Sequence, residues 1–231
     1  MPEPTFGTLR TTVSGSLGTL TLARPERLNA LSRRTLIELA EAARWFDSQR
    51  DVRVVVVQGE GRSFSAGFDL DDFSTPDPEW SVRDTADLGR LMAEAVTGMT
   101  AITIAAIQGH CVGGGLVLAA SCDLRYAADT AVFSIPEVDL GIPLAWGGIP
   151  RLVREIGPAA TKELVLTCRR FHPDEARALG FLNDVVPAEA LQSHVDEIAR
   201  AIAAKPGYAL RTTKQQVNAV TEEIAGTGRN T

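Results

Sequence analysis

The sequence predicts an α/β domain with a mostly parallel sheet, followed by a helical C-terminal part. Stretches typical of strands alternate with stretches of helical periodicity from residue 5 to residue 134. The runs 52–57 and 102–108 are almost continuously apolar, which is the pattern of strands covered on both faces by helices. The chain has 231 residues, of which 45% are hydrophobic, and this suits one large domain or one domain with an appendage.

The N-terminal elements are predicted as a hairpin, a helix and a buried strand. Thr, Val and Leu flank the turn Ser14–Ser16, so residues 5–23 read as two strands. Ser32 is a candidate N-cap for a helix of about 16 residues, because apolar side chains recur at helical spacing behind it. The β-branched run over 52–57 then gives the next strand.

The middle and C-terminal elements are predicted from turn-forming residues and from the spacing of apolar residues. Pro76, Asp77 and Pro78 make residues 73–82 an irregular segment. We then expect a helix over 87–98, a strand over 102–108, a short apolar helix over 113–121, and a third strand region formed by 123–127 with 131–134. From Pro158 onward the pattern is helical, with a short extended piece at 183–186 and an amphipathic helix over about 187–204.

Charge and composition exclude several classes of partner. The chain carries 23 Lys and Arg against 29 Asp and Glu, a net charge of -6, and no block of five or six basic residues. Neither nucleic acid nor an anionic membrane surface is therefore expected to bind it. Its longest apolar stretches fall well short of the roughly 18 to 20 residues of a membrane span, so no transmembrane segment is expected. Residues 1–6 do not resemble a signal peptide, which predicts a cytoplasmic location.

The cysteines and histidines do not form a recognisable metal or disulfide pattern. The three cysteines are widely spaced without a Cys-x-x-Cys pair, and we expect them to be small buried apolar residues. The three histidines are far apart and show no metal-ligand spacing. The sequence therefore predicts no metal site.

Two glycine-containing stretches are candidates for anion binding through the main chain. The cluster Gly109–Gly115 is followed by Leu116 and Val117, so it fits neither a dinucleotide fingerprint nor a phosphate loop. Glycine allows close approach to the main chain, and the first amides of a helix lack internal partners, so such a turn favours an anion or a developing oxyanion. A second stretch, Ser63–Leu70, follows the strand that ends near Gln58. The alternative is that both stretches are simply tight turns that pack helices on a sheet.

The order of these motifs resembles the crotonase, or enoyl-CoA hydratase/isomerase, superfamily. The resemblance runs from about Gly18 to Lys214 and is carried by four pieces in order: Arg24–Leu31, Phe64–Leu70, Gly109–Leu116 ending at Cys122–Arg125, and Phe133–Glu137 with Leu140–Gly141. It implies the crotonase spiral fold of ββα units, with residues 1–190 as a core that holds the acyl-CoA site. Residues 191–231 would form a short, truncated C-terminal helical region whose last residues are disordered.

The resemblance implies an oxyanion hole made of two main-chain amides. By motif position these belong to Phe68, which follows Ala-Gly, and to Gly114, the middle glycine of the triplet. A proton next to a thioester is too weak an acid for a carboxylate base unless the enolate oxygen is stabilised. Because both contacts use the backbone, a phenylalanine at the first position leaves the donor in place.

The resemblance also implies that Glu137, in the Pro-Glu motif, is the acid/base. Family hydratases carry a second glutamate after the glycine triplet, where this chain has Val117. A single carboxylate can move a proton from C2 to C4, which is Δ3,Δ2-enoyl-CoA isomerisation. A further acidic position of dienoyl-CoA isomerases is Ala145 here, which disfavours that subgroup. The alternatives left open are hydration with one glutamate, other oxyanion-hole chemistry such as thioester hydrolysis or decarboxylation, a non-catalytic acyl-CoA carrier, and an assembly subunit with a vestigial pocket.

Further residues are implied in binding of CoA and the acyl group. They are Arg27, Leu28, Ala30, Ala66, Phe68, Asp69, Leu70, Gly113, Gly114 and Trp146. Trp146 is a candidate wall of the acyl pocket, with core packing as the alternative, and Asp69 is interpreted mainly as ordering its loop. Arg24, Arg27, Arg33 and Arg34 could place positive charge near the CoA phosphates or could form a solvated helix start.

The assembly and the C-terminus are also expectations from the resemblance. No cofactor is expected, because CoA is part of the substrate, and the partners implied are an acyl-CoA substrate and further copies of the chain in a homotrimer or a hexamer. Family members usually continue with helices that cover the pocket, whereas this sequence stops at Thr231. That difference leaves the covering of the site open.

Overall fold

The computed structural model describes residues 4–74 and 82–225. Most of the predicted irregular segment 73–82 and the predicted disordered tail, residues 226–231, lie outside the described residues. At the edges of the former, helix α2 spans Leu70–Ser74 and helix α3 spans Val82–Gly98, so α3 begins earlier than the predicted residue 87.

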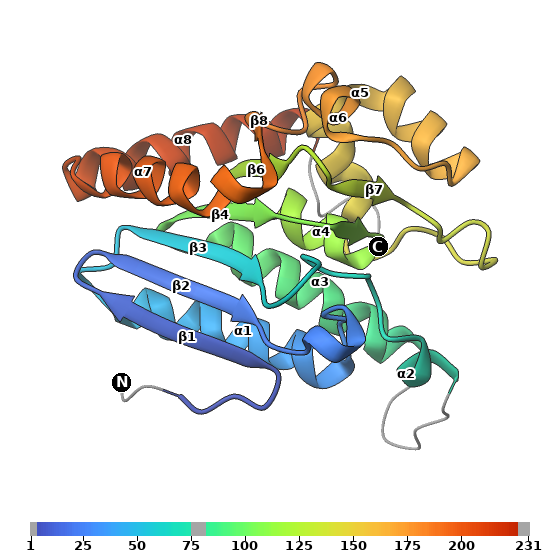
Figure 1. The fold of residues 1–231 in the computed structure, drawn as a ribbon, viewed down its shortest axis with the longest axis horizontal. Coiled ribbons are helices and arrows are strands. Elements are labelled where there is room, and N and C mark those ends of the chain that lie inside the picture. The colour runs from blue at the N-terminus through green and yellow to red at the C-terminus, as the bar shows by residue number, and fades with distance from the viewer. Residues whose placement is uncertain (1–3, 75–81, 226–231) are drawn as a thin grey trace.

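The main sheet has six strands in the order β1-β2-β3-β4-β6-β8 (Figure 1). Its strands are β1 Leu9–Ser14, β2 Leu17–Leu22, β3 Val54–Gly59, β4 Ile102–Ile107, β6 Leu124–Ala128 and β8 Asp184–Val186. Strands β1 and β2 form the predicted antiparallel hairpin, with Ser14 paired to Leu17 at the turn. All other neighbours in this sheet are parallel. The predicted mostly parallel sheet is therefore confirmed.

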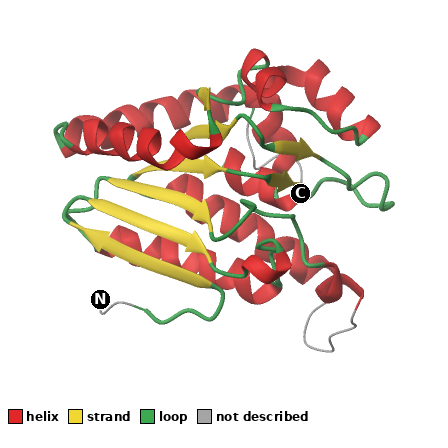
Figure 2. Ribbon diagram, viewed as in Figure 1, coloured by secondary structure: helices red, strands yellow, loops and turns green. Residues whose placement is uncertain are grey.

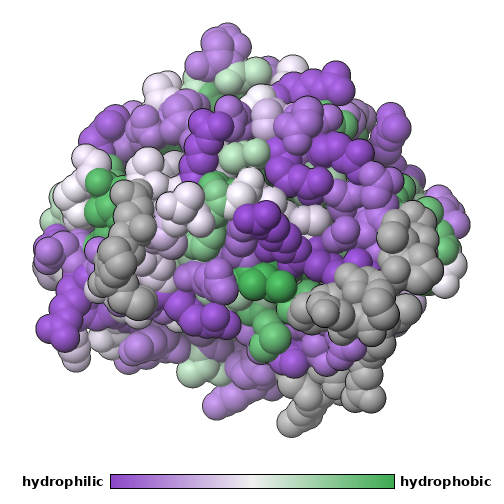
Figure 3. Space-filling view, turned by 90° about the horizontal axis from the view of Figure 1, so that it is seen from below, coloured by the Kyte–Doolittle hydropathy of each residue, from purple (hydrophilic) through white to green (hydrophobic). Residues whose placement is uncertain are grey.

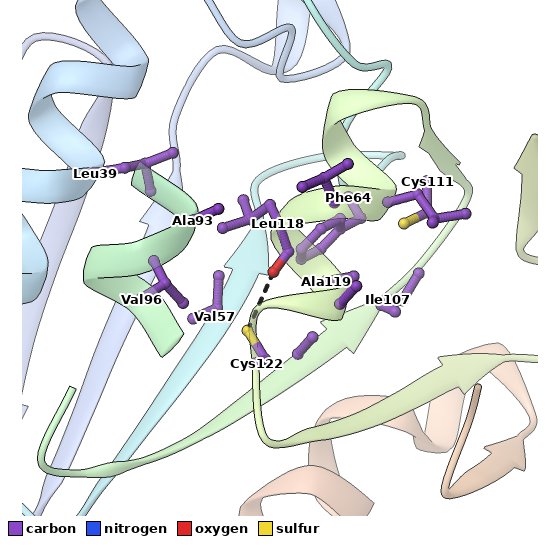
Figure 4. Packing of buried hydrophobic residues seen from close by; sticks show 14 of the residues in the cluster. Leu39, Val57, Phe64, Ala93, Val96, Ile107, Cys111, Leu118, Ala119 and Cys122 are labelled. Carbon is purple, nitrogen blue, oxygen red and sulfur yellow. Dashed lines mark hydrogen bonds between the residues drawn. The ribbon is translucent and has the colours of Figure 1, made fainter. Parts of the chain in front are cut away.

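Helices cover both faces of the sheet, as the apolar strands predict (Figure 2). Val55 and Val57 of β3 point into the larger core, which holds α1 (Arg33–Ser48), α3 and α4 (Gly114–Ala120). Figure 4 shows this packing around Leu39, Ala93, Val96 and Leu118. Val54 and Val56 point to the other face, against α7 (Leu191–Ala203). The strand period of two thus divides one valine run between two cores.

Helix α1 has the boundaries that its sequence predicts. It spans 16 residues from Arg33, and the side chain of Ser32 accepts a hydrogen bond from the Thr35 amide at 3.2 Å. A serine at this position satisfies one of the first-turn amides that have no partner within the helix. The apolar face of α1 packs on β1 and α3. This packing fixes the place where the loop before α1 ends.

A second, two-stranded sheet was only half predicted. Strand β5 (His110–Val112) pairs in parallel with β7 (Val132–Ser134). The sequence interpretation joined residues 123–127 and 131–134 into one strand region, and it missed β5. The structure places β6 and β7 in different sheets. Strand β5 has three residues inside the glycine cluster, so its stability comes from pairing with distant segments rather than from a local pattern.

The C-terminal helices begin earlier than Pro158. Helix α5 spans Gly148–Thr167, and Gly157, with φ 76° and ψ 165°, divides it just before the proline. The remaining elements are η1 Pro25–Arg27, α6 Pro173–Ala178, η2 Ala188–Ala190 and α8 Gly207–Ile224. The predicted extended piece is β8, and the predicted helix over 187–204 corresponds to η2 and α7.

Helix α8 is fixed to the sheet by a buried lysine. The Nζ of Lys214 lies 2.8 Å from Asp123 Oδ2 and donates to the Ala101 carbonyl at 2.8 Å. Asp123 also accepts hydrogen bonds from the amide and the hydroxyl of Thr103, so it links α8 to the start of β4. Hydrophilic side chains cover most of the face seen in Figure 3, around a compact hydrophobic patch. Among the helices of residues 4–74 and 82–225, none is long and apolar enough to cross a membrane.

Candidate active site

The two predicted glycine-containing turns lie side by side. Ser65 pairs with Cys111 of β5, through bonds from the Ser65 amide to the His110 carbonyl (2.9 Å) and from the Val112 amide to the Ser65 carbonyl (3.1 Å). Phe68 and Gly114 each lie three residues beyond this pair. The close approach requires glycine at position 67, where φ is +90° and an added Cβ would lie 2.7 Å from the Val112 carbonyl oxygen and 3.5 Å from the Gly114 nitrogen.

The amides of Phe68 and Gly114 differ from those around them. Within the described parts of the chain, neither donates a hydrogen bond to a backbone or side-chain acceptor. Their neighbours do: the Asp69 amide donates to Leu31 at 3.1 Å, and the Gly113 amide donates to Ser134 at 2.9 Å. Gly114 is the first residue of α4, a position without an intrahelical acceptor. Two such amides on adjoining turns can donate to one negatively charged oxygen.

Glu137 reaches this place from the loop that follows β7. A Cβ on Gly113 would overlap its Oε1, so the carboxylate lies directly over the Gly113 backbone. The other oxygen, Oε2, is buried and accepts no hydrogen bond from any residue that the structure describes. Burial raises the pKa of the Glu137 carboxyl, and a backbone hydrogen bond opposes this only in part. A buried carboxyl with an unpaired oxygen and a raised pKa has the properties of a general base.

The positions of the second family carboxylates are apolar in structure as well as in sequence. Val117 is completely buried in α4, and a Cβ on Gly148 of α5 would lie 2.8 Å from its Cγ2. Ala145 is a half-buried residue packed against the core. Both positions are therefore occupied by uncharged side chains that pack in the core.

The predicted CoA loop is tied to the same turns. The Ala66 amide donates to the Leu28 carbonyl at 2.9 Å, and the Leu31 amide donates to the Gly67 carbonyl at 2.8 Å. Leu28 has a φ of +50° and ends η1, while Ala30 is buried. These hydrogen bonds bring the predicted residues 27–30 and 66–69 together in the loops that follow the parallel strands β2 and β3.

Asp69 joins these two segments through charge. Its buried carboxylate pairs with Arg24 at 2.8 Å and Arg27 at 3.1 Å, and it accepts from the Asp71 amide at 3.2 Å. The two guanidinium groups and the amide lower the pKa of Asp69 despite its burial, which by itself raises it. The structure thus agrees with the interpretation that Asp69 orders its loop.

The four arginines near this loop all have acidic or carbonyl partners. Arg27 also pairs with Asp71, Arg33 donates to the Asp72 carbonyl at 2.8 Å, and Arg34 pairs with Glu38 at 2.8 Å. None of the four is therefore an unpaired cation, and the side chains of Arg34 and Arg27 are 69% and 44% exposed. Leu70, in contrast, is exposed.

Trp146 is buried beside the two amides. Its ring lies edge-on to the ring of Phe68, with centroids 5.8 Å apart. A Cβ on Gly114 would overlap the indole, and so would a Cβ on Gly89 of α3. The structure therefore places Trp146 against both predicted oxyanion residues.

Two residues of this environment were missed in the sequence. Arg151 is 1% exposed and donates to the Gly147 carbonyl at 3.0 Å and to the Thr97 hydroxyl at 3.3 Å, and burial lowers its pKa to about 10. No local pattern distinguishes it from a surface arginine of an amphipathic helix. Gly89 did carry a signal, because a glycine inside a helical pattern often marks a close approach.

The cysteines match their prediction only in part. Cys111 and Cys122 are buried and Cys168 is half-buried, and all three are free. Burial raises the pKa of the Cys122 thiol to about 12. In the described residues, no group of three or more His, Cys, Asp or Glu side chains could hold a metal ion.

The fold and these motifs define an enzyme of the crotonase class, and comparisons with known proteins agree. A sequence model of the enoyl-CoA hydratase/isomerase family matches residues 12–230. The chain is 34% identical over 97% of its length to a probable enoyl-CoA hydratase of Mycobacterium bovis, of which it covers 86%. It is 36% identical over 91% of its length to a peroxisomal Delta(3,5)-Delta(2,4)-dienoyl-CoA isomerase of Arabidopsis thaliana, of which it covers 80%.

Solved structures give the same result. A putative enoyl-CoA hydratase from Thermobifida fusca in complex with CoA superposes with a TM-score of 0.85 at 30% identity, over 98% of this chain and 96% of that one. An enoyl-CoA hydratase structure from Geobacillus kaustophilus gives a TM-score of 0.86 at 36% identity, over 94% of this chain and 83% of that one. The protein belongs to the enoyl-CoA hydratase/isomerase family, and the predicted crotonase fold is confirmed.

Proposed function

We propose that the protein isomerises 3-enoyl-CoA to 2-enoyl-CoA, with Glu137 as the single acid/base. The observation that carries the proposal is the Glu137 carboxylate, which lies over Gly113 next to two unpaired amides and has a buried oxygen without a hydrogen bond among the described residues. Membership of the family supports an acyl-CoA substrate. The residue at the second glutamate position of hydratases, Val117, favours isomerisation over hydration.

The amides of Phe68 and Gly114 stabilise the enolate in this proposal. The thioester carbonyl accepts a hydrogen bond from each of them, and these bonds strengthen as negative charge develops on the oxygen. Preorganised donors of this kind contribute on the order of 10²–10³ in rate per donor in other enzymes. Position 114 requires glycine because the Trp146 ring packs against its main chain. Gly67 allows the turn before Phe68 to approach Val112 and Gly114.

Glu137 moves one proton within the substrate. Its carboxylate takes a proton from C2, and the electron pair of the broken C2–H bond forms the C1=C2 bond of the enolate as the carbonyl electrons move to the oxygen. When the carbonyl forms again, the C1=C2 electrons become the C2=C3 bond and the C3=C4 electrons shift to C4. The same carboxyl group returns the proton to C4. Atoms and electrons balance without any oxidant, reductant or cofactor, because CoA is part of the substrate. The raised pKa makes Glu137 a stronger base than an exposed glutamate.

Hydration needs a group that orients and activates water in addition to the proton donor. Val117 fills the corresponding position with a buried side chain packed near Gly148. Relatives are named as hydratases and as a dienoyl-CoA isomerase, so the family is compatible with both reactions. Hydration by Glu137 alone is therefore the second candidate.

The CoA moiety is proposed to bind along residues 27–30 and 66–70 through main-chain groups. The support is that hydrogen bonds hold these segments together beside Gly114. Arg24, Arg27 and Arg33 contribute mainly by ordering this surface through Asp69, Asp71 and Asp72. A trimeric or hexameric assembly in the cytoplasm completes the proposal.

The test presents the purified protein and its Glu137→Gln variant with 3-hexenoyl-CoA, 2-hexenoyl-CoA and hexanoyl-CoA. Mass and ultraviolet absorbance follow the double-bond position and the addition of water. We expect 3-hexenoyl-CoA to become 2-hexenoyl-CoA with the normal enzyme and to remain almost unchanged with the variant. Addition of water to 2-hexenoyl-CoA as the faster reaction would overturn isomerisation in favour of hydration. Binding of hexanoyl-CoA without turnover of either enoyl ester would indicate a non-catalytic carrier.

A further inference from the structure

Trp146 is held between two helices by contacts with the main chain of two glycines. Its indole packs on the main chain of Gly114 at the start of α4 and of Gly89 in the middle of α3. Glycine in a helix interior is unfavourable relative to alanine, so its presence at position 89 is accounted for by the ring that occupies the place of a side chain. The indole is thus clamped between two helices beside Phe68.

The backbone of Trp146 is constrained as well as its ring. Its φ is +60°, in the left-handed region that is costly for a bulky residue, and Gly147 follows with a φ of +66°. The buried guanidinium of Arg151 donates to the Gly147 carbonyl at 3.0 Å and approaches the Trp146 carbonyl at 3.5 Å. Arg151 therefore positions the turn that presents the indole.

A cavity borders the same indole, and neither Phe68 nor Gly114 is among its lining residues. It has a volume of about 980 Å³ and is lined by Trp146 with Ala86, Asp87 and Arg90 of α3 and with Pro143, Leu144 and Ile149. The segment that contributes the last three residues is mostly apolar, and Asp87 and Arg90 form an ion pair at 3.3 Å. A cavity of this size could hold a long acyl chain.

The geometry points to Trp146 as the residue that determines acyl chain length. We propose that its indole separates the thioester site at Phe68 and Gly114 from this cavity, and thereby restricts the enzyme to short acyl chains. The inference rests on the proposed function, since it requires the thioester to lie at these two amides. Removing the indole would connect the thioester site with the cavity and admit longer chains.

The first test compares Trp146→Ala and Trp146→Leu with the normal protein. The kcat/KM values for 3-hexenoyl-CoA and 3-dodecenoyl-CoA are measured, together with the dissociation constants of hexanoyl-CoA and dodecanoyl-CoA by calorimetry. We expect the smaller side chains to raise the preference for the long over the short ester on the order of tenfold in both measurements. Trp45→Phe is the matched control, because Trp45 is buried in α1 away from this site, and it should leave both ratios within about twofold.

Several results would overturn the inference. An unchanged chain-length preference in a folded Trp146→Ala or Trp146→Leu variant would do so. If neither variant folds, the normal protein decides, because tighter binding of dodecanoyl-CoA than of hexanoyl-CoA contradicts a closed passage. The calorimetry also separates the two proposals: a shift in binding preference without turnover would support the role of Trp146 while rejecting isomerisation.

A second pair of variants tests whether the contact with α3 fixes the position of the indole. Gly89→Ala places a methyl group where the Trp146 ring lies, whereas a Cβ on Gly98 of the same helix meets nothing within 4 Å. We expect Gly89→Ala to lower kcat/KM for 3-hexenoyl-CoA about tenfold, because the displaced ring moves against the thioester site. Gly98→Ala should leave kcat/KM unchanged. Equal kcat/KM values for the two variants would contradict the proposed role of the contact between Gly89 and the indole.

Discussion

The loops that carry Asp69 and Glu137 place two carboxylates beside one site in opposite environments. Asp69 is 4% exposed and paired with Arg24 and Arg27. Glu137 has a buried oxygen without a partner among the described residues, and it forms no ion pair there. The pKa of Asp69 is lowered by its charged neighbours, whereas that of Glu137 is raised by burial.

The comparison teaches that the surroundings of a carboxylate decide whether it suits a structural or a chemical role. A carboxylate whose oxygens are saturated by guanidinium groups and an amide is a poor base, but it holds segments together. A carboxylate that is desolvated and unpaired destabilises the fold, and this cost is typical of groups kept for chemistry. Asp69 therefore belongs to the framework and Glu137 to the proposed reaction.

Glu137→Gln should give the largest effect and sharpens the comparison most. We expect a loss on the order of 10³-fold in kcat for 3-hexenoyl-CoA, because the amide cannot take the proton. The free energy of unfolding in urea should not fall, since the variant removes a buried charge without a partner. Activity that survives in Glu137→Gln would place Glu137 with Asp69 in the framework.

Gly113→Ala tests whether the position of the Glu137 carboxylate matters. The added Cβ would overlap Oε1 and displace the carboxylate. We expect kcat to fall about tenfold to a hundredfold. Gly15→Ala is the control for backbone strain, because Gly15 also has a positive φ of +59° but lies in the hairpin turn with nothing within 4 Å of the added atom. Equal activities of the two variants would show that the carboxylate has no required position.

Asp69→Asn should affect stability more than chemistry. The variant removes the negative charge that binds Arg24 and leaves a buried amide in its place. We expect the free energy of unfolding to fall by about 2 kcal/mol, measured in urea at neutral pH. The folded variant should retain most of its kcat, with a higher KM for the CoA ester. A loss of kcat as large as that of Glu137→Gln would remove the distinction between the two carboxylates.

The pH dependence of stability should differ in sign between the two groups, and this is the smallest effect. The pKa of Asp69 is lowered in the folded state, so its contribution is present above the unfolded pKa and is lost as the pH falls through the folded value. The pKa of Glu137 is raised in the folded state. Its contribution to the free energy of unfolding is therefore present below the pKa of the unfolded state and is lost as the pH rises through the pKa of the folded state. Urea unfolding at several pH values should therefore show the cost of Asp69→Asn shrinking in acid, and the gain from Glu137→Gln growing toward neutral pH. The same sign for both variants would break the comparison.

Much of the scaffold could be predicted from local sequence. The Ser32 cap, the hairpin and the valine run of β3 each carry a pattern within a few residues. The candidate site was predicted from the order of short motifs, because main-chain functions depend on glycines at fixed positions. Asp69 was predicted to order its loop, and its partners Arg24 and Arg27 lie in the preceding motif.

The remaining features depend on contacts between distant segments. Strand β5 exists through its pairing with β7 and Ser65, and three residues give too short a period to recognise. The contact of Trp146 with Gly89 joins a loop to a helix far away in sequence. Arg151 is indistinguishable from a surface residue until α5 is packed, because burial is a tertiary property.

The most direct test of the central claim follows a label through the proposed proton transfer. 3-Hexenoyl-CoA deuterated at C2 is converted in a single turnover in ordinary water, and mass spectrometry locates the deuterium in the product. If Glu137 alone moves the proton, part of the label appears at C4 of 2-hexenoyl-CoA, because the buried carboxyl returns it before exchange with solvent. A 2-hexenoyl-CoA product with no deuterium at C4, or a hydrated product, would contradict the account.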